Sequence, residues 1–235
     1  MAKKPETLHE SRTIVYGDKH WSHLASLRER AMDIMQTLES SGIHSFVYGS
    51  IARGDVGKSS DVDIIVPYPV SSYKLEISAG RGVRRELVQA TPSMVLKGHI
   101  VLDDRTTVTF PLFKLRPREE EFYSWGGRAD ISQLEAEIRV SGVDKRLVLI
   151  RPTPEGHTEH GVIGYEPDVA KAVGVSIETA KERVRVLTRR DRLGRTGVYL
   201  TRVLEEDDSF EAVAKSLRDS DPALRRTVEK RERSR

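Results

Sequence analysis

The 235-residue sequence contains no cysteine and no asparagine, and glutamine occurs only at Gln36, Gln89 and Gln133. The absence of cysteine excludes disulfide bonds, zinc sites built from thiolates and thiol nucleophiles. Few amide side chains beside many Glu, Lys and Arg are the residue bias of heat-adapted proteins, so we expect a thermophilic source. Compositional drift in a GC-rich genome is the alternative explanation.

Long apolar runs are also missing. No stretch of about 18 apolar residues occurs, which excludes a membrane-spanning helix. The first residues, Met1 to Glu6, have no apolar segment behind their charges, so we expect no secretory signal and a cytoplasmic protein.

The charge is nearly balanced in total but uneven along the chain. There are 39 Lys and Arg against 36 Asp and Glu, a formal net charge of +3. Basic residues gather in 171–195 and again in 222–235. Local basic clusters point to nucleic acid better than the total charge does, whereas the alternative is a solvated helix face.

Hydrophobic spacing and turn residues predict an α/β arrangement in the first 150 residues. The expected helices are 22–41, with Ser22 as its N-cap, and 80–91. The expected strands are 45–48, 61–66, 97–102, 106–112 and 145–150.

Breaker residues divide the rest of the chain. Pro152, Pro154 and Gly156 predict a domain boundary near 150–160. Beyond it we expect helix 166–173, a glycine turn, helix 177–187 and a two-stranded wing near 193–200. The predicted domains are therefore 1–150, 155–205, and a C-terminal helix with a basic tail over 206–235.

The segment with the clearest chemistry is Gly49-Ser50 followed by Asp61-x-Asp63. A glycine after a strand lets the backbone approach a ligand closely, and a hydroxyl with nearby N–H groups can hold phosphate oxygens. Residues two apart on a strand share a face, so Asp61 and Asp63 project together. Two such carboxylates repel each other unless a cation joins them, and Mg²⁺ with a nucleoside triphosphate supplies one.

The runs Tyr48-Gly49-Ser50-Ile51-Ala52-Arg53-Gly54 and Ser60-Asp61-Val62-Asp63-Ile64-Ile65-Val66 resemble the signature of the DNA polymerase beta-type nucleotidyltransferase superfamily. The resemblance implies that superfamily's α/β fold, a mixed sheet with flanking helices. It also implies an enzyme that uses Mg²⁺ or Mn²⁺ and takes a nucleoside triphosphate as substrate. An acceptor hydroxyl would attack the α-phosphorus and pyrophosphate would leave.

The same resemblance implies roles for individual residues. Gly49 and Ser50 would bind the triphosphate, and Asp61 and Asp63 would hold the metal ions and act in catalysis. Arg53 and Lys58 would neutralise phosphate charge.

One departure from the superfamily pattern concerns a third carboxylate on a neighbouring strand. The matching strand carries Thr107 and Thr109 where an acid is expected. Asp104, and after it Asp103, are the candidates for a third catalytic acid from the preceding turn. The run Glu119-Glu120-Glu121 is a poorer candidate because such runs are usually solvated.

Residues 162–204 resemble a winged helix-turn-helix. Its combination with the first domain is similar to a type of predicted archaeal nucleotidyltransferase. The resemblance implies binding to DNA or RNA through the second helix and the wing. The residues expected to contact nucleic acid are Lys181, Arg183, Arg185 and Arg195. Packing on the catalytic domain, or assembly into a homodimer, is the alternative role.

Smaller clusters have two interpretations each. Phe122, Tyr123 and Trp125 could stack a base, but such a group is more often a core anchor at a domain junction. The His157/His160 pair and the His20/His23 pair lack a third neighbouring histidine, which argues against zinc.

Three functions remain at this point. The leading hypothesis is a metal-dependent nucleotidyltransferase whose acceptor is nucleic acid or is recruited with it. The alternatives are a non-catalytic, nucleotide-sensing, DNA-binding regulator, and a nucleotidyltransferase that modifies a protein or a small molecule.

Overall fold

The computed structural model of the chain describes residues 4–194 and 197–233, which divide into two compact units. Unit 1 comprises Met1–Met32, Val47–Ser60 and Glu120–Thr196. Unit 2 comprises Asp33–Phe46, Asp61–Glu119 and Gly197–Arg235. The units interleave along the chain, and the division into 1–150, 155–205 and 206–235 stays a prediction.

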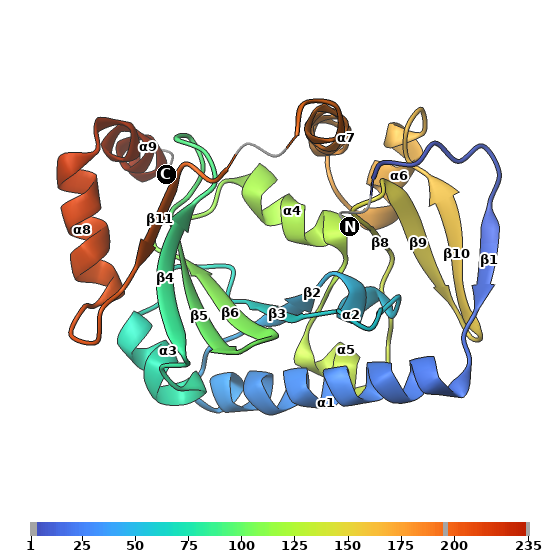
Figure 1. The fold of residues 1–235 in the computed structure, drawn as a ribbon, viewed down its shortest axis with the longest axis horizontal. Helices are drawn as coiled ribbons and strands as arrows, with labels where there is room; N and C mark the ends of the chain where they lie inside the picture. Colours follow the sequence, from blue (N-terminus) through green and yellow to red (C-terminus); the bar gives the residue numbers. More distant parts are fainter. Residues whose placement is uncertain (1–3, 195–196, 234–235) are drawn as a thin grey trace. The chain divides into compact units, whose positions relative to one another are not determined.

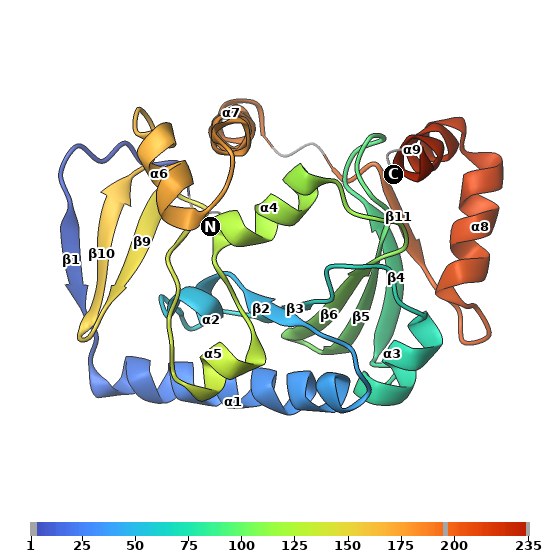
Figure 2. The same cartoon turned by 180° about the vertical axis from the view of Figure 1, so that it is seen from behind.

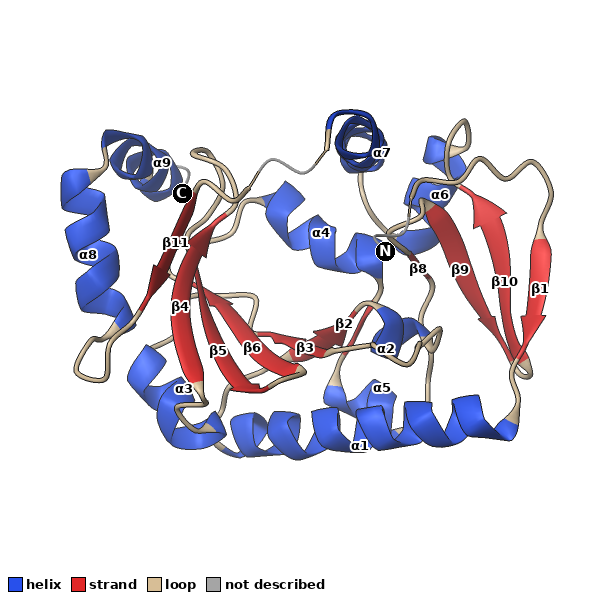
Figure 3. Cartoon of the chain, in the orientation of Figure 1, coloured by secondary structure: helices blue, strands red, loops and turns tan. Residues whose placement is uncertain are grey.

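Unit 1 contains a four-stranded antiparallel sheet, shown in red in Figure 3. Its strands, in spatial order, are β1 (Arg12–Val15), β10 (Gly156–Gly161), β9 (Val148–Thr153) and β8 (Gly142–Val143). The short strands β2 (Phe46–Tyr48) and β7 (Arg128–Ala129) pair with each other in antiparallel fashion and belong to the second, seven-stranded sheet. The helices that lie wholly or largely in this unit are α1 (Asp18–Ser40), α2 (Ser50–Arg53), α4 (Pro117–Gly126), α5 (Ile131–Glu135), α6 (Glu166–Val173) and α7 (Ile177–Leu193).

The core of unit 1 joins the sheet to the α6–α7 helix pair. Trp125 of α4 packs with Leu149 of β9, Val169 of α6 and Ala180 of α7, each less than 5% exposed. Burial of this apolar surface stabilises the helix pair against the sheet. The prediction that Trp125 and Tyr123 anchor a core is confirmed, because both side chains are buried.

Unit 2 is built on five strands of a mixed sheet. In spatial order they are β11 (Leu200–Val203), β4 (Arg84–Gln89), β5 (Lys97–Asp103), β6 (Thr106–Pro111) and β3 (Val62–Ile65). The β3–β6 pair is parallel and the other pairs are antiparallel. The helices of this unit are α3 (Ser72–Ala79), α8 (Phe210–Ser220) and α9 (Pro222–Glu232). The predicted mixed α/β fold is thus confirmed.

The two faces of the unit 2 sheet differ in chemistry. On one face Ile64, Ile100 and Leu87 are fully buried, and Phe110 meets Phe210 of α8 with ring centroids 5.0 Å apart. Helix α8 lies along this apolar side of the strands in both views (Figures 1 and 2). The opposite face, called here the polar face, carries partly exposed side chains at most of the alternate positions, whereas Ile65 and Thr109 are buried there. It includes Asp63, Thr107, Thr109, His99 and Lys97, as the strand registers require.

Two local predictions are wrong. Residues 84–89 form strand β4, not a helix over 80–91, because they pair with β5 on one side and β11 on the other. Helix α1 begins at Asp18, four residues before the predicted cap Ser22. The C-terminal tail is helix α9, with Leu224 and Val228 buried.

The two predicted helices and the glycine turn between them are present, but the predicted winged helix-turn-helix is not shown. Gly174 adopts the left-handed conformation after α6, and the Ser176 side chain accepts a hydrogen bond from the Thr179 N–H to cap α7. Beyond α7, residues 195–196 lie outside the described residues. Strand β11 pairs with β4, so a winged domain is not shown in the described part of the chain.

Candidate nucleotide and metal site

The backbone after β2 turns at Gly49. Its φ of 84° and ψ of −141° belong to a region that residues with a Cβ rarely adopt. The Gly49 N–H donates to the Gly127 carbonyl at 2.8 Å, which fixes the turn. A Cβ built at this position would meet no atom within 4 Å, so the glycine is required by backbone geometry and leaves open space beside it.

Hydroxyl groups close the loop that follows. The Ser50 Oγ lies 3.0 Å from the Ser60 Oγ, and the Gly57 N–H donates to the Ser60 Oγ at 2.9 Å. Lys58 is exposed at the tip of this loop. The structure therefore brings Ser50 and Ser60 together at the base of a short loop that also carries Lys58.

Arg53 has structural partners in this loop. Its side chain is only 6% exposed, and it donates from Nε and Nη2 to the two carboxylate oxygens of Asp55, at 2.9 and 3.0 Å. Its Nη1 donates to the Gly126 carbonyl at 2.5 Å. A bidentate arginine pair of this kind is geometrically specific. The guanidinium thus holds the loop, and its predicted contact with phosphate stays a prediction.

The first helix also anchors the loop, which sequence reasoning missed. Buried Arg28 donates to the Ile51 carbonyl at 3.1 Å, and burial lowers the pKa of its guanidinium to about 10. His20 Nε2 donates to the Gly54 carbonyl at 2.7 Å and His23 Nε2 donates to the Gly57 carbonyl at 3.1 Å. The two histidines that suggested a weak metal motif therefore bind backbone carbonyls.

The Asp61-x-Asp63 segment lies in unit 2 at the start of β3. The Val62 N–H donates to the Arg105 carbonyl at 2.7 Å, which sets the β3–β6 register. Val62 and Ile64 are buried, Asp61 is exposed and Asp63 is partly exposed. Alternation along the strand turns both carboxylates away from the apolar face, as predicted.

The donor set of these two residues suits a divalent cation. Mg²⁺ in phosphoryl-transfer sites is usually held by one or two carboxylates, with substrate phosphates and waters completing the shell. Asp61 and Asp63 supply two carboxylates on one face. Among the described residues no group of three or more His, Asp or Glu side chains is placed to hold a metal ion.

The turn that carries the predicted third acid is well defined. The Arg105 N–H donates to Asp103 Oδ1 at 2.9 Å, so the Asp103 carboxylate closes the β5–β6 turn. Asp104 is exposed at the tip of that turn. Asp63 is the register partner of Thr107, so threonine stands beside it on the neighbouring strand. The role of Asp104 stays a prediction.

Comparison with known families decides the class of this region. Residues 28–122 match the family described as the nucleotidyltransferase domain. This part of the chain, less than half of its length, is similar to that family. A domain of this family suggests a nucleotidyltransferase enzyme, which favours catalysis over the non-catalytic alternative. No curated protein and no solved structure matches the chain.

The matched nucleotidyltransferase domain contains both parts of the motif and the whole polar face. On that face His99 Nδ1 lies 3.1 Å from the Thr109 Oγ1. Burial and then the charges of Lys97 and Arg84 lower the pKa of His99 to about 4. Burial lowers the pKa of Lys97 to about 8, against the opposing charge of Glu119.

Outside the matched domain, the predicted nucleic-acid residues differ in exposure. Lys181 and Arg185 of α7 are exposed. Arg183 lies over the Phe122 ring, 4.8 Å from its centroid, and burial lowers its pKa to about 10. Arg195 lies outside the described residues. None of the helices in the described part of the chain is long and apolar enough to span a membrane.

Proposed function

We propose that the protein transfers a nucleoside monophosphate from a nucleoside triphosphate to an acceptor hydroxyl. The observation that carries the proposal is the position of Asp63 on the polar face of the unit 2 sheet. The apolar face of the same sheet is covered by Phe210 of α8. A sheet with one buried face can leave its other face to solvent, and the partly exposed Asp63 lies on that other face.

The proposed roles follow from the chemistry of each group. Asp61 and Asp63 hold the divalent cations, and Gly49, Ser50 and Lys58 hold the triphosphate. When bound, Mg²⁺ or Mn²⁺ supplies positive charge that neutralises the phosphate oxygens. A bond forms between the acceptor oxygen and the α-phosphorus, the bond to the bridging oxygen breaks, and pyrophosphate carries the electron pair away. Asp104 is the proposed third acid that accepts the hydroxyl proton.

Transfer of α-labelled nucleotide tests this proposal. The purified protein is incubated with each ribonucleotide and deoxyribonucleotide, Mg²⁺ or Mn²⁺, and RNA, DNA, protein or small-molecule acceptors. We expect label in one acceptor pool, and a loss of about 100-fold or more in Asp61→Asn or Asp63→Asn, the scale of removing one group that stabilises a transition state. Asp33→Asn, which alters an exposed carboxylate on α1, is the matched control.

The outcome separates the remaining alternatives. Transfer that survives both substitutions would contradict the assignment of Asp61 and Asp63. Intact nucleotide binding with no transfer to any acceptor would favour the DNA-binding regulator. Loss of nucleotide transfer in Asp104→Asn would support Asp104 as the third acid. Unchanged transfer would contradict that role.

We further propose that the acceptor is a nucleic acid recruited by α7. Four of the exposed basic residues of that helix recur at intervals of three or four, which places them on one face, whereas exposed Arg190 lies on the other side. The four are Lys181, Arg185, Arg189 and Arg192. Such a face suits a phosphate backbone, and sequence composition alone does not separate DNA from RNA. An archaeal or thermophilic source and a homodimer stay predictions from resemblance and composition.

Salt dependence tests the nucleic-acid proposal. We expect the affinity for a DNA or RNA duplex to fall as salt rises. The double variant Lys181→Gln/Arg185→Gln should reduce the slope of log affinity against log salt concentration by about 1 to 2. Lys215→Gln, which alters an exposed lysine on α8, should leave the slope unchanged. Equal slopes in all three proteins would place the acceptor site elsewhere and favour a protein or small-molecule acceptor.

A further inference from the structure

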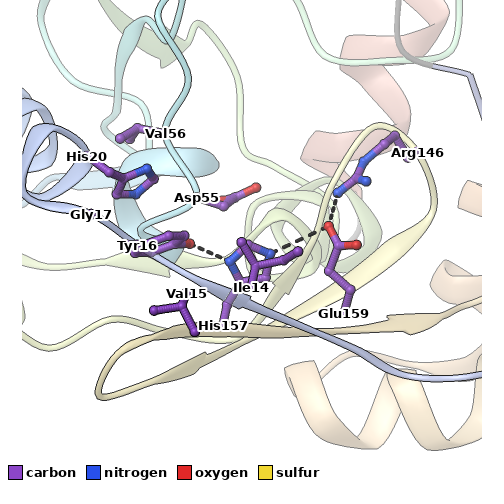
Figure 4. Close-up of a pocket in the computed structure, with 10 residues that line it drawn as sticks. All are labelled: Ile14, Val15, Tyr16, Gly17, His20, Asp55, Val56, Arg146, His157 and Glu159. Atoms are coloured by element: carbon purple, nitrogen blue, oxygen red, sulfur yellow. Dashed lines mark hydrogen bonds and ion pairs between the residues drawn. The ribbon is translucent and has the colours of Figure 1, made fainter.

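Unit 1 contains a cavity of about 450 Å³ that is distinct from the motif residues. It lies between the end of β1, the first turn of α1, the segment after α2, and β10, and Figure 4 shows its lining side chains. That volume is within the range of small-molecule sites. The nucleotidyl-transfer proposal uses none of the side chains that line it.

One wall of the cavity is a chain of titratable groups. The Tyr16 hydroxyl lies 2.5 Å from His157 Nδ1, and His157 Nε2 lies 3.5 Å from Glu159 Oε1 (Figure 4). Glu159 in turn accepts from Arg146 and from Arg12. His157 and Glu159 are only 5% and 4% exposed. Buried polar groups in a row of this kind are costly unless each is paired, so the row has a structural or functional reason.

The neighbouring groups fix the protonation of this row. Because a carboxylate only accepts, the proton of neutral His157 belongs on Nε2, facing Glu159, and Nδ1 accepts from the Tyr16 hydroxyl. Burial lowers the pKa of His157, which keeps the ring neutral at neutral pH. Burial and then the charge of Asp55 raise the pKa of Tyr16, so its phenol keeps its proton. The Nε2 atom makes no hydrogen bond within the described residues.

Arginine donors around the cavity are already used within the chain. Arg146 donates to Asp144 and Glu159, Arg53 donates to Asp55 and the Gly126 carbonyl, and Arg139 donates to two backbone carbonyls. Acceptors keep spare capacity, because each carboxylate oxygen has two lone pairs and a phenol oxygen that donates can still accept. The cavity therefore offers acceptors at Asp55, Glu159 and Tyr16, while the arginine donors around it are occupied and, among the described residues, the Nε2–H of His157 remains a free donor.

An aromatic pair completes the lining. The rings of Tyr16 and His20 are stacked with centroids 3.6 Å apart and an interplanar angle of 20°. Aromatic faces attract cations, and the carboxylates of Asp55 and Glu159, each already paired with arginine, still offer acceptor oxygens to an ammonium group. We infer that this cavity is a second ligand site, which takes a small molecule carrying a protonated amine.

The site is connected to the predicted nucleotide loop through one residue. The same Asp55 carboxylate that lines the cavity holds Arg53 by two hydrogen bonds. An ammonium group at Asp55 shares this carboxylate with the guanidinium of Arg53. Occupancy of the cavity therefore acts on the loop that begins at Gly49, whether or not the nucleotidyl-transfer assignment holds.

The test uses the full chain and two matched probes. Butane-1,4-diamine carries ammonium groups, and butane-1,4-diol has the same backbone without charge. Binding is measured by calorimetry and by the ring-proton NMR signals of His157 and His20. We expect the diamine to bind and shift both signals, and the diol to bind at least about tenfold more weakly, the factor that corresponds to about 1.4 kcal/mol.

Variants locate the binding site. Tyr16→Phe removes the phenol oxygen and Asp55→Asn removes one charge. Each should weaken binding of the diamine by about tenfold, as expected for one lost hydrogen bond to a charged group. Tyr73→Phe, at a tyrosine that is 72% exposed on α3, is the matched control and should bind as the parent does. Thermal melts establish that each variant is folded.

Three results would overturn the inference. These are equal binding of diol and diamine, no binding of the diamine, and unchanged affinity in both Tyr16→Phe and Asp55→Asn. If Asp55→Asn fails to fold, Tyr16→Phe alone decides, because it removes one oxygen and keeps the ring.

Discussion

Asp63 of β3 and Thr107 of β6 are direct register partners in the parallel pair of strands. Neighbouring strands are about 4.8 Å apart, so the two side chains stand side by side on the same face. In the superfamily that the motif resembles, a carboxylate is expected on this neighbouring strand. Here the position offers a hydroxyl, which neither carries the charge of a metal ligand nor accepts a proton as a base does.

Thr107→Asp should create the missing acid. Without metal, two carboxylates side by side repel, and we expect a loss of roughly 0.2–1 kcal/mol in the free energy of unfolding. Mg²⁺ should reverse this loss, because a cation that joins the carboxylates stabilises the folded state by binding to it. Melts in EDTA and in Mg²⁺ measure both effects. Thr107→Asn is the neutral control, and an equal response of the two variants to Mg²⁺ would contradict a metal site at Asp63.

Gly49→Ala should weaken the nucleotide loop through the backbone alone. With φ at 84° and no atom within 4 Å of the added Cβ, the cost is conformational strain of about 1–3 kcal/mol. The matched control is Gly57→Ala in the same loop, where φ is not positive and the Cβ also meets nothing within 4 Å. Urea unfolding and binding of a nucleoside triphosphate should both distinguish the two variants. Equal behaviour would show that the turn at Gly49 relaxes without cost.

The parts of the fold that sequence predicts well are those whose information is local. Strand β3 alternates apolar Val62 and Ile64 with Asp63, and a two-residue turn separates β5 from β6. Such patterns depend on neighbours along the chain, so the hairpin and the Asp-x-Asp strand are confirmed where they were expected.

Strand β4 shows why other parts were wrong. Val83, Leu87 and Val88 have a spacing that also suits a helix, but the buried positions are Arg85, Leu87 and Gln89. Arg85 is buried because it donates to the carbonyls of residues 205, 206 and 208, more than a hundred positions away. An arginine that is buried against distant carbonyls leaves no local signal in the sequence. The two-residue alternation of buried and exposed positions along β4 was therefore not visible as a hydrophobic pattern.

The cavity near Tyr16 could not be predicted for the same reason. Tyr16, Asp55 and His157 are far apart in sequence and meet only because β1 pairs with β10 and α1 packs beside the α2 loop. Each residue alone resembles an ordinary surface or core residue. The acidic run at Glu119–Glu121 is a further example, since Glu119 binds Arg231 and Glu121 accepts from Ser176.

His99 should give the protein a pH-dependent stability. Burial lowers its pKa from 6.5 to about 4, so between these values the unfolded chain binds a proton that the folded chain does not. The free energy of unfolding therefore falls as pH drops through this window, by up to about 3 kcal/mol. Urea unfolding at pH 7 and pH 4.5 should show a smaller loss in His99→Gln than in the parent. His9→Gln, at an exposed histidine, is the matched control.

Arg231 should hold the C-terminal helix in unit 2. Its side chain is 2% exposed, and its two Nη atoms each lie 2.6 Å from a carboxylate oxygen of Glu119. Arg231→Ala leaves the partner carboxylate buried without its cation, and we expect a loss of about 3–5 kcal/mol in the free energy of unfolding. Arg226→Ala, at an exposed arginine of the same helix, should change it by less than about 0.5 kcal/mol.

The Arg231–Glu119 ion pair also predicts how stability changes at acidic pH, which distinguishes the contribution of its charge from that of side-chain packing. Burial raises the pKa of Glu119, but hydrogen bonds from Arg231 and from backbone N–H groups outweigh it, and the net pKa is lowered. A lowered carboxylate pKa contributes stability that is present at neutral pH and is lost as pH falls through the folded-state value. Arg231→Ala should therefore lose less stability than the parent when the pH is lowered from 7 to 3, as followed by urea unfolding. Parallel pH profiles for the two proteins would mean that packing of the arginine side chain, and not its charge, holds α9 in place.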